Sequence, residues 1–183
     1  QLPKAELHIY GSYPPPKATA LNNPKTGFLI KGWADNAFDV MQSARVCLAP
    51  LRFGAGIKGK LLEAMIMQTP SVTTSIGVEG MHNDLPWSGK VANNTEDFAN
   101  AAVELYTNET DFTHAQQAGN TLLNTVYDKV KLSAALINKI DAISSDLSAH
   151  REKNFTGQML KHHTMRSTQY MAQWIAEKNK KLD

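Results

Sequence analysis

The chain has 183 residues, of which 42% are hydrophobic and 20% charged, and its net charge is +2. This composition is ordinary for a globular protein, and the length suffices for one domain with a substantial core. The single cysteine excludes an internal disulfide, and no apolar run is long enough to span a bilayer. Because no charged-then-apolar leader opens the chain, we expect a cytoplasmic protein. The first residue is Gln1 rather than methionine, so we also expect a fragment or a processed product.

Apolar runs of strand length alternate with helical patterns through the first half of the chain. The expected strands are residues 6–10, 28–32, 45–50, 71–74 and 90–92, and the expected helices are residues 35–44, 58–67 and 95–106. This alternation predicts an α/β fold with a parallel sheet between helices. Asp35 and Thr95 are expected to cap two of these helices. Residues 12–17 contain three consecutive prolines and are expected to form a loop.

Beyond Glu109 the pattern is helical throughout, and the charge is uneven. Residues 151–183 hold seven basic and three acidic side chains, so their balance is +4. Residues 1–150 hold twelve basic and fourteen acidic side chains, a balance of −2, which does not suggest a nucleic-acid-binding protein. We therefore expect one domain over residues 1–150 and a basic amphipathic helical tail over residues 151–183. The apolar stripe of this tail consists of Leu160, Met171, Trp174 and Ile175.

The most informative segment is a glycine-rich turn between the strand near residue 47 and the helix that begins near Lys58. Gly54 and Gly56 let the backbone approach a ligand closely, and the free amides of a helix N-terminus favour a phosphate. Arg52, Lys58 and Lys60 add positive charge there. A purely structural turn remains the alternative, with Lys60 and Glu63 as a surface ion pair. The glycine spacing matches neither a dinucleotide-binding fingerprint nor a P-loop.

This turn and several other segments, in the same order along the chain, resemble the group 1 glycosyltransferases, a family of retaining enzymes with the GT-B fold. The resemblance covers roughly residues 5–127. The segments that carry it are Leu7-His-Ile-Tyr-Gly11, Phe28-Leu-Ile-Lys-Gly-Trp33, the turn with the Leu-Glu-Ala helix that follows it, Ile66-Met-Gln-Thr-Pro-Ser-Val-Thr73, Gly77-Val-Glu-Gly-Met81 and Lys90-Val-Ala-Asn-Asn-Thr-Glu-Asp-Phe98. The resemblance implies the Rossmann-like, nucleotide-sugar-binding C-terminal half of a GT-B fold. It further implies that a preceding strand and the N-terminal acceptor half are absent, so that an unpaired strand edge would favour self-association.

The resemblance also implies roles for residues of the turn and the helix after it. Gly56 and Ile57 would present backbone amides to the donor, while Lys58 would neutralise charge on the departing nucleotide. Glu63 corresponds to the second of the family's two glutamates and would accept hydrogen bonds from the ribose. The first glutamate corresponds to Ala55, which departs from the pattern and leaves the sugar undefined. We therefore predict Lys58 and Glu63 as catalytic residues.

The expected donor-binding set also contains Gly11, Ser12 and Arg52. Gly11 and Ser12 lie at a strand end, where they could contact the base or the phosphate, and Arg52 could contact the phosphate or remain solvated. The complete donor-binding set is Gly11, Ser12, Arg52, Ala55, Gly56, Ile57, Lys58 and Glu63. The histidines lack the spacing of metal ligands, so we expect no metal and no cofactor other than the donor itself.

The sequence therefore predicts the donor-binding portion of an enzyme that transfers a sugar from a nucleoside diphosphate sugar to a hydroxyl acceptor. By resemblance, its context is bacterial polysaccharide or glycolipid synthesis. A non-catalytic α/β interaction module and a nucleotide-sugar epimerase of GT-B architecture are the alternatives. The tail is expected to cross to the N-terminal half, or else to contact the inner face of a membrane.

Overall fold

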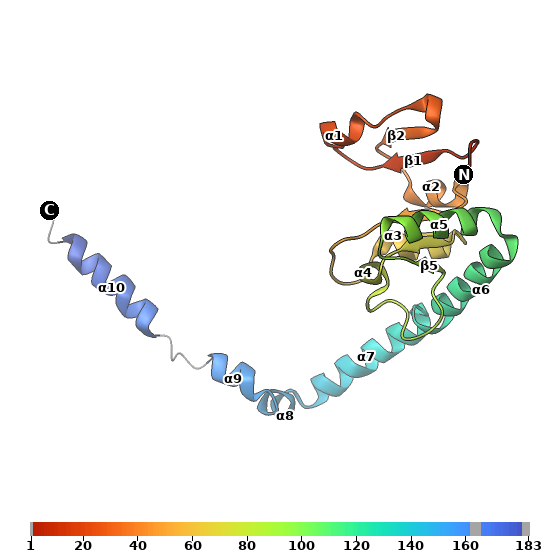
Figure 1. Cartoon of the computed structure of the whole chain (residues 1–183). Coiled ribbons are helices and arrows are strands. Elements are labelled where there is room, and N and C mark those ends of the chain that lie inside the picture. The colour runs from red at the N-terminus through yellow and green to blue at the C-terminus, as the bar shows by residue number, and fades with distance from the viewer. Residues whose placement is uncertain (1, 162–165, 181–183) are drawn as a thin grey trace. The chain divides into compact units, whose positions relative to one another are not determined.

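The computed structural model describes residues 2–161 and 166–180. Its internal contacts divide the chain into two compact units, Gln1–Asp128 and Lys129–Asp183. The first unit contains all the described strands, and the second consists of helices (Figure 1). The functional division expected at residue 150 is a different boundary and stays a prediction.

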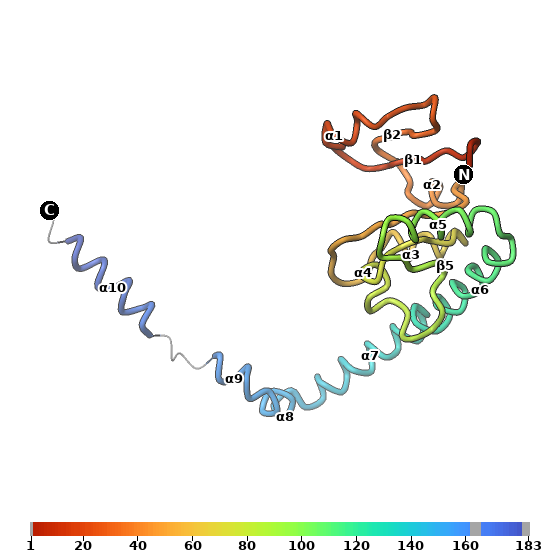
Figure 2. Tube along the Cα trace, in the orientation of Figure 1, coloured from red at the N-terminus to blue at the C-terminus, as the bar shows by residue number. Residues whose placement is uncertain are grey.

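All five expected strands form, and every pairing between them is parallel. β1 (Leu7–Tyr10) pairs with β2 (Phe28–Gly32), whereas β3 (Cys47–Ala49) pairs with β4 (Ser71–Thr73), which pairs with β5 (Gly89–Val91). The strands therefore form two parallel sheets, one of two strands and one of three. The alternation of strand and helix in this unit can be followed along the trace in Figure 2.

The central strand of the three-stranded sheet, β4, is buried on both faces. Val72 is fully buried against Leu105 and Ala115. Its neighbours Ser71 and Thr73 point to the opposite face because side chains alternate along a strand, and both are buried as well. Burial on both faces is typical of the central strands of parallel sheets.

Seven short helices connect or flank these strands. They are α1 (Pro16–Thr19), the 3₁₀ helix η1 (Pro24–Thr26), α2 (Ala37–Ser43), α3 (Gly59–Ile66), α4 (Ser75–Val78), α5 (Thr95–Thr107) and α6 (Glu109–Thr125). The main core lies where α3 meets α6. Its buried side chains are Leu61, Met65, Val78, Met81, Trp87 and Leu122.

Three sequence-based expectations about local structure were wrong by small margins. The N-cap of α2 is Asn36 rather than Asp35, and the N-cap of α5 is Asn94 rather than Thr95. Both asparagine side chains accept a hydrogen bond from a backbone amide of the first turn, which they do at least as well as the residues we expected. The proline-rich loop is shorter than expected because Pro16 begins α1, where its fixed φ suits the first helical position.

The second unit consists of α7 (Lys129–Ser145), α8 (Leu147–Glu152), α9 (Phe155–Lys161) and α10 (Arg166–Lys180). None of its described residues is buried. Large apolar side chains such as Leu136 and Trp174 are more than half exposed. Among the described residues, no helix is long and apolar enough to cross a membrane.

Candidate donor-binding site

The turn between β3 and α3 requires glycine at one position in particular. Gly56 has a φ of +68°, a left-handed conformation that side chains other than glycine rarely adopt. The residues around it, Arg52, Ala55 and Ile57, are exposed. The turn therefore presents backbone to solvent at the carboxyl end of β3, just ahead of the free amides of α3.

Two threonines at the end of β4 hold this turn in place. Thr73 Oγ1 donates a hydrogen bond to the carbonyl of Ala49 at 2.8 Å, and Thr74 Oγ1 donates one to the carbonyl of Leu51 at 2.6 Å. Gly77 in α4 packs directly against Thr73, and a methyl group at Gly77 would overlap the Thr73 hydroxyl. These contacts fix the start of the turn to β4 and to the residue that follows it. Sequence reasoning missed both threonines, although Thr73 directly follows the apolar Val72 and Thr74 comes next.

Lys58 is the N-cap residue of α3 and is half-buried. Its Nζ donates a hydrogen bond to the carbonyl of Glu79 at 3.2 Å, which tethers the side chain next to the turn. A cation held at a helix N-terminus adds to the positive end of the helix dipole, so both favour an anion at this point. The Glu79 carbonyl is a partner that no sequence motif indicates.

Glu63 lies in the second turn of α3 and is paired with Lys60, with 3.0 Å between Lys60 Nζ and Glu63 Oε2. The Glu63 side chain is 26% exposed and the Lys60 side chain 68%. The ion pair considered as an alternative from sequence is therefore present. A ribose role for Glu63 stays a prediction, and it would require the hydroxyls to share the carboxylate with Lys60.

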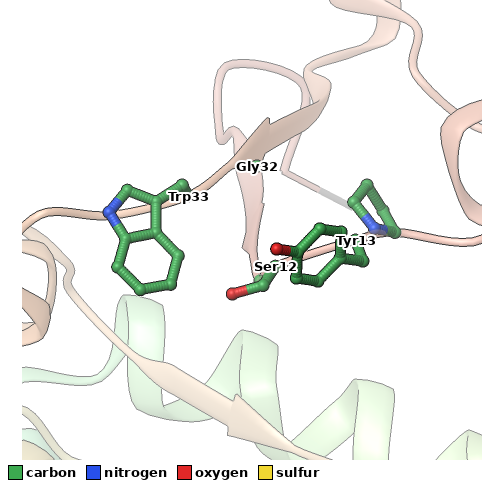
Figure 3. A pocket seen from close by; sticks show the side chains of 6 residues that line it. Ser12, Tyr13, Gly32 and Trp33 are labelled. Atoms are coloured by element: carbon green, nitrogen blue, oxygen red, sulfur yellow. The ribbon is translucent and has the colours of Figure 1, made fainter.

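Gly11 and Ser12 lie elsewhere, at the carboxyl end of β1. The Gly11 amide donates a hydrogen bond to the Gly32 carbonyl at 2.7 Å, which joins the ends of β1 and β2. Beside them is an open hollow of about 310 Å³ (Figure 3). Its lining residues are Gly11, Ser12, Tyr13, Pro14, Gly32 and Trp33. Sequence reasoning gave no role to Tyr13, three residues after β1, or to Trp33, directly after β2.

The predicted site residues thus form two groups, one on each sheet. Arg52 to Lys58, with Glu63, lie on or after β3, whereas Gly11 and Ser12 lie after β1. Within the ranges that the structure describes, no hydrogen bond or ion pair links the two groups. All strands are parallel within their sheets, and both groups lie at carboxyl ends, which is where open α/β folds bind ligands.

Two further observations concern the chemistry available in the described part of the chain. No cluster of three or more His, Cys, Asp or Glu side chains there could hold a metal ion. Cys47 lies in β3 directly ahead of the turn, and burial raises the pKa of its thiol to about 11. The thiol is therefore neutral at physiological pH and is no candidate nucleophile.

The fold and the site can now be compared with known proteins. The crystal structure of TarM is similar, with a TM-score of 0.54 and 18% sequence identity; the match covers 74% of this chain and 28% of the TarM chain. The chain therefore spans little more than a quarter of that protein. This likeness confirms the fold class: parallel sheets flanked by helices, matching the Rossmann-like half of a GT-B fold. None of the curated proteins compared with the chain matches it.

The sequence itself matches the family described as "Glycosyl transferases group 1" over residues 1–108. This match covers more than half of the chain, so the chain belongs to the group 1 glycosyltransferases. The resemblance identified from the ordered segments is confirmed.

Proposed function

We propose that this chain is the donor-binding portion of a retaining glycosyltransferase, and that the turn between β3 and α3 holds the diphosphate of a nucleoside diphosphate sugar. The observation that carries the proposal is the combination of exposed backbone at Gly56, the N-terminus of α3 and the tethered cation of Lys58. Each of these three features favours an anion, and together they suit the two phosphates of a nucleotide.

The proposed chemistry gives Lys58 a role in the departure of the nucleotide. When the bond between the anomeric carbon and the phosphate oxygen breaks, negative charge grows on the diphosphate, and a cation already in place stabilises that charge. The acceptor hydroxyl forms the new bond to the anomeric carbon and passes its proton to an oxygen of the departing diphosphate, which leaves as the nucleoside diphosphate. In the retaining course proposed here, the new bond forms on the face that the nucleotide leaves. The backbone amides of Gly56 and Ile57 would bind the donor in both the ground and transition states.

Glu63 is proposed to accept hydrogen bonds from the ribose hydroxyls. Its carboxylate is partly exposed, so a ligand can reach it, and its pairing with Lys60 orients it. Lys60 is itself largely exposed and can move toward a phosphate when a ribose takes its place on Glu63. No metal is proposed, because amides and basic side chains supply the compensating charge.

Calorimetric titration of the chain with UDP, GDP and ADP tests the proposal, with the matching nucleosides as controls for phosphate dependence. Lys58→Ala should weaken diphosphate binding about 10- to 100-fold, because a charge-assisted hydrogen bond is lost. Lys25→Ala is the matched control, since Lys25 is an exposed lysine ahead of the amino end of β2. If no nucleotide binds while the fold is intact, the chain is instead the non-catalytic module considered from sequence.

For the second unit, we propose that its exposed apolar side chains pack on the acceptor-binding half of the complete enzyme. None of the described residues of α7 to α10 is buried, although Leu136, Ile140 and Trp174 would each gain from burial. Sedimentation with anionic vesicles separates this from a membrane role. Strong vesicle binding by the chain would contradict the packing proposal, whereas binding to a separately produced acceptor half would support it.

A further inference from the structure

One exposed glutamate lies next to the turn between β3 and α3 but belongs to another element. Glu79 is the C-cap residue of α4, and its backbone carbonyl accepts the hydrogen bond from Lys58 Nζ at 3.2 Å. The Cε atom of Lys58 lies 4.0 Å from the position that a Cβ of Gly54 would take, so the lysine side chain lies against the turn itself. The backbone of Glu79 is therefore beside this turn, although Lys58 and Glu79 are 21 positions apart.

The position of Glu79 is fixed by its buried neighbours. It lies in a β-turn over residues 78–81, which is closed by a hydrogen bond of 2.9 Å from the Met81 amide to the Val78 carbonyl. The φ of −54° and ψ of 120° at Glu79, followed by the φ of +70° at Gly80, match a type II turn. Val78 and Met81 are both buried, so both ends of this β-turn are anchored in the core. Because Gly80 has no side chain, the Glu79 carboxylate is the group that the β-turn presents to solvent.

The Glu79 carboxylate is also available to a ligand. Within residues 2–161 and 166–180, no hydrogen bond or ion pair engages it. The usual structural use of a glutamate beside a lysine is an ion pair, but Lys58 donates to the Glu79 carbonyl instead. The lysine is therefore held by the backbone of Glu79, and the carboxylate remains free.

The turn between β3 and α3 has no side chain that could accept a hydrogen bond from a sugar hydroxyl. The side chains of residues 53–57 are apolar or absent, while Arg52 and Lys58 can only donate hydrogen bonds. A donor sugar is attached directly to the diphosphate, so its hydroxyls lie near this turn whenever the phosphates bind there. Hydroxyls that lose water without gaining a partner weaken binding, and a carboxylate is the strongest acceptor that a side chain can offer them.

We propose that the Glu79 carboxylate binds hydroxyl groups of the donor sugar while the turn between β3 and α3 holds the diphosphate. This inference rests on the proposed function, because only a diphosphate at the turn brings the sugar to Glu79. The ligand class that the arrangement suits is a nucleoside diphosphate linked to a hexose with free hydroxyls, since two neighbouring hydroxyls can share the two oxygens of one carboxylate. Sugar and diphosphate are then recognised by separable groups, the side chain of Glu79 and the side chain of Lys58.

Calorimetry on the full chain with three pairs of ligands tests this assignment. The pairs are UDP with UDP-glucose, GDP with GDP-mannose, and ADP with ADP-glucose, and the pair that binds most tightly is used for the variants. Glu79→Ala should weaken binding of the sugar nucleotide about 5- to 50-fold. Glu79→Gln should weaken it by a smaller factor, because the amide oxygen still accepts a hydrogen bond but carries no charge. Both variants should leave binding of the diphosphate alone within about twofold, since the backbone carbonyl that holds Lys58 is retained.

Glu96→Ala is the matched control, because Glu96 is an exposed glutamate in the first turn of α5, and it should leave binding of both ligands unchanged. Equal losses for the sugar nucleotide and the diphosphate in Glu79→Ala would show that the residue only supports Lys58, and would overturn the inference. No loss for either ligand would also overturn it and leave the proposed function standing. Failure of all six ligands to bind the folded chain would remove the proposed function, and the role of Glu79 with it.

Discussion

The two sheets of the first unit are both built from short parallel strands, yet they differ in how deeply these strands are buried. In the sheet of β3, β4 and β5, the central strand is fully buried and both faces are covered by helices. In the sheet of β1 and β2, all four residues of β1 are exposed. Each sheet carries one part of the candidate site. The turn after β3, where we propose that the diphosphate binds, is therefore built on a rigid base, whereas the hollow lined by Tyr13 and Trp33 lies on a base that has more freedom to move.

The largest effect that would sharpen this comparison is the loss of a core leucine. Leu61 of α3 is buried in the main cluster, whereas Leu7 of β1 is 37% exposed. Leu61→Ala should lower the free energy of unfolding by about 2–5 kcal/mol, since a buried cavity forms. Leu7→Ala should cost less than about 1 kcal/mol. Urea titration of both variants measures the difference, and equal losses would show that the two sheets are buried alike.

A pair of glycines provides the second contrast. Gly77 packs against Thr73, so Gly77→Ala forces a shift near the turn between β3 and α3 and should cost about 1–3 kcal/mol. Gly11 has open space around it and an ordinary φ, so Gly11→Ala should change stability by less than about 0.5 kcal/mol. Thermal unfolding of the two variants measures both losses of stability. A larger loss from Gly11→Ala would contradict the view that only the β3–β5 side is tightly packed.

The third contrast is between the ion pairs of the two regions at low pH. Hydrogen bonds from Glu104 and Lys90 lower the pKa of the Asp111 carboxyl below its usual value. The ionised form is thus favoured in the folded state, and its stabilising effect is present above the unfolded pKa and lost as the pH falls through the folded pKa. Asp111→Asn should flatten the loss of stability below about pH 4.

The corresponding pair near the other sheet joins His8 of β1 to Glu6, which directly precedes β1. The distance between His8 Nε2 and Glu6 Oε2 is 2.7 Å. Glu6→Gln should have little effect on stability because both partners are exposed to solvent. Denaturant midpoints for the two variants between pH 3 and 7 measure both effects. A stronger pH dependence in the Glu6 variant would reverse the comparison.

The last contrast concerns Cys47, whose thiol has a pKa of about 11 because of burial. The unfolded thiol ionises at lower pH, near 8.5. Stability should therefore fall as the pH rises from about 9 to 11, since only the unfolded state loses the proton early. Cys47→Ala should remove this slope. An unchanged slope in the variant would show that other groups cause it.

The sequence was sufficient for the five strands and for α2, α3 and α5, but it did not predict the short helices α1, η1 and α4. β4 and α3 were predicted within two residues of their observed bounds because buried apolar runs and a helical stripe leave little ambiguity. The caps at Asn36 and Asn94 were missed by one residue, because asparagine, aspartate and threonine are all good N-caps and only the backbone decides between neighbours.

Other features could not be read from the sequence, for identifiable reasons. The positive φ of Tyr13 contradicts the ordinary preference of tyrosine, so no propensity would predict it. The contacts of Thr73 and Lys58 join segments more than twenty residues apart, and spacing within one segment cannot reveal them. For Glu63, sequence offered both a ribose contact and an ion pair with Lys60. The ion pair is present, and only a ligand can test the ribose contact.

The central claim is that the turn after β3 binds the diphosphate of a nucleotide. Backbone amide chemical shifts, recorded while UDP or ADP is added to the chain, test it most directly. The account predicts the largest changes at the amides of Gly54, Gly56, Ile57 and Gly59, and their loss in Lys58→Ala. Saturable changes confined to other segments, with these four amides unmoved, would contradict it.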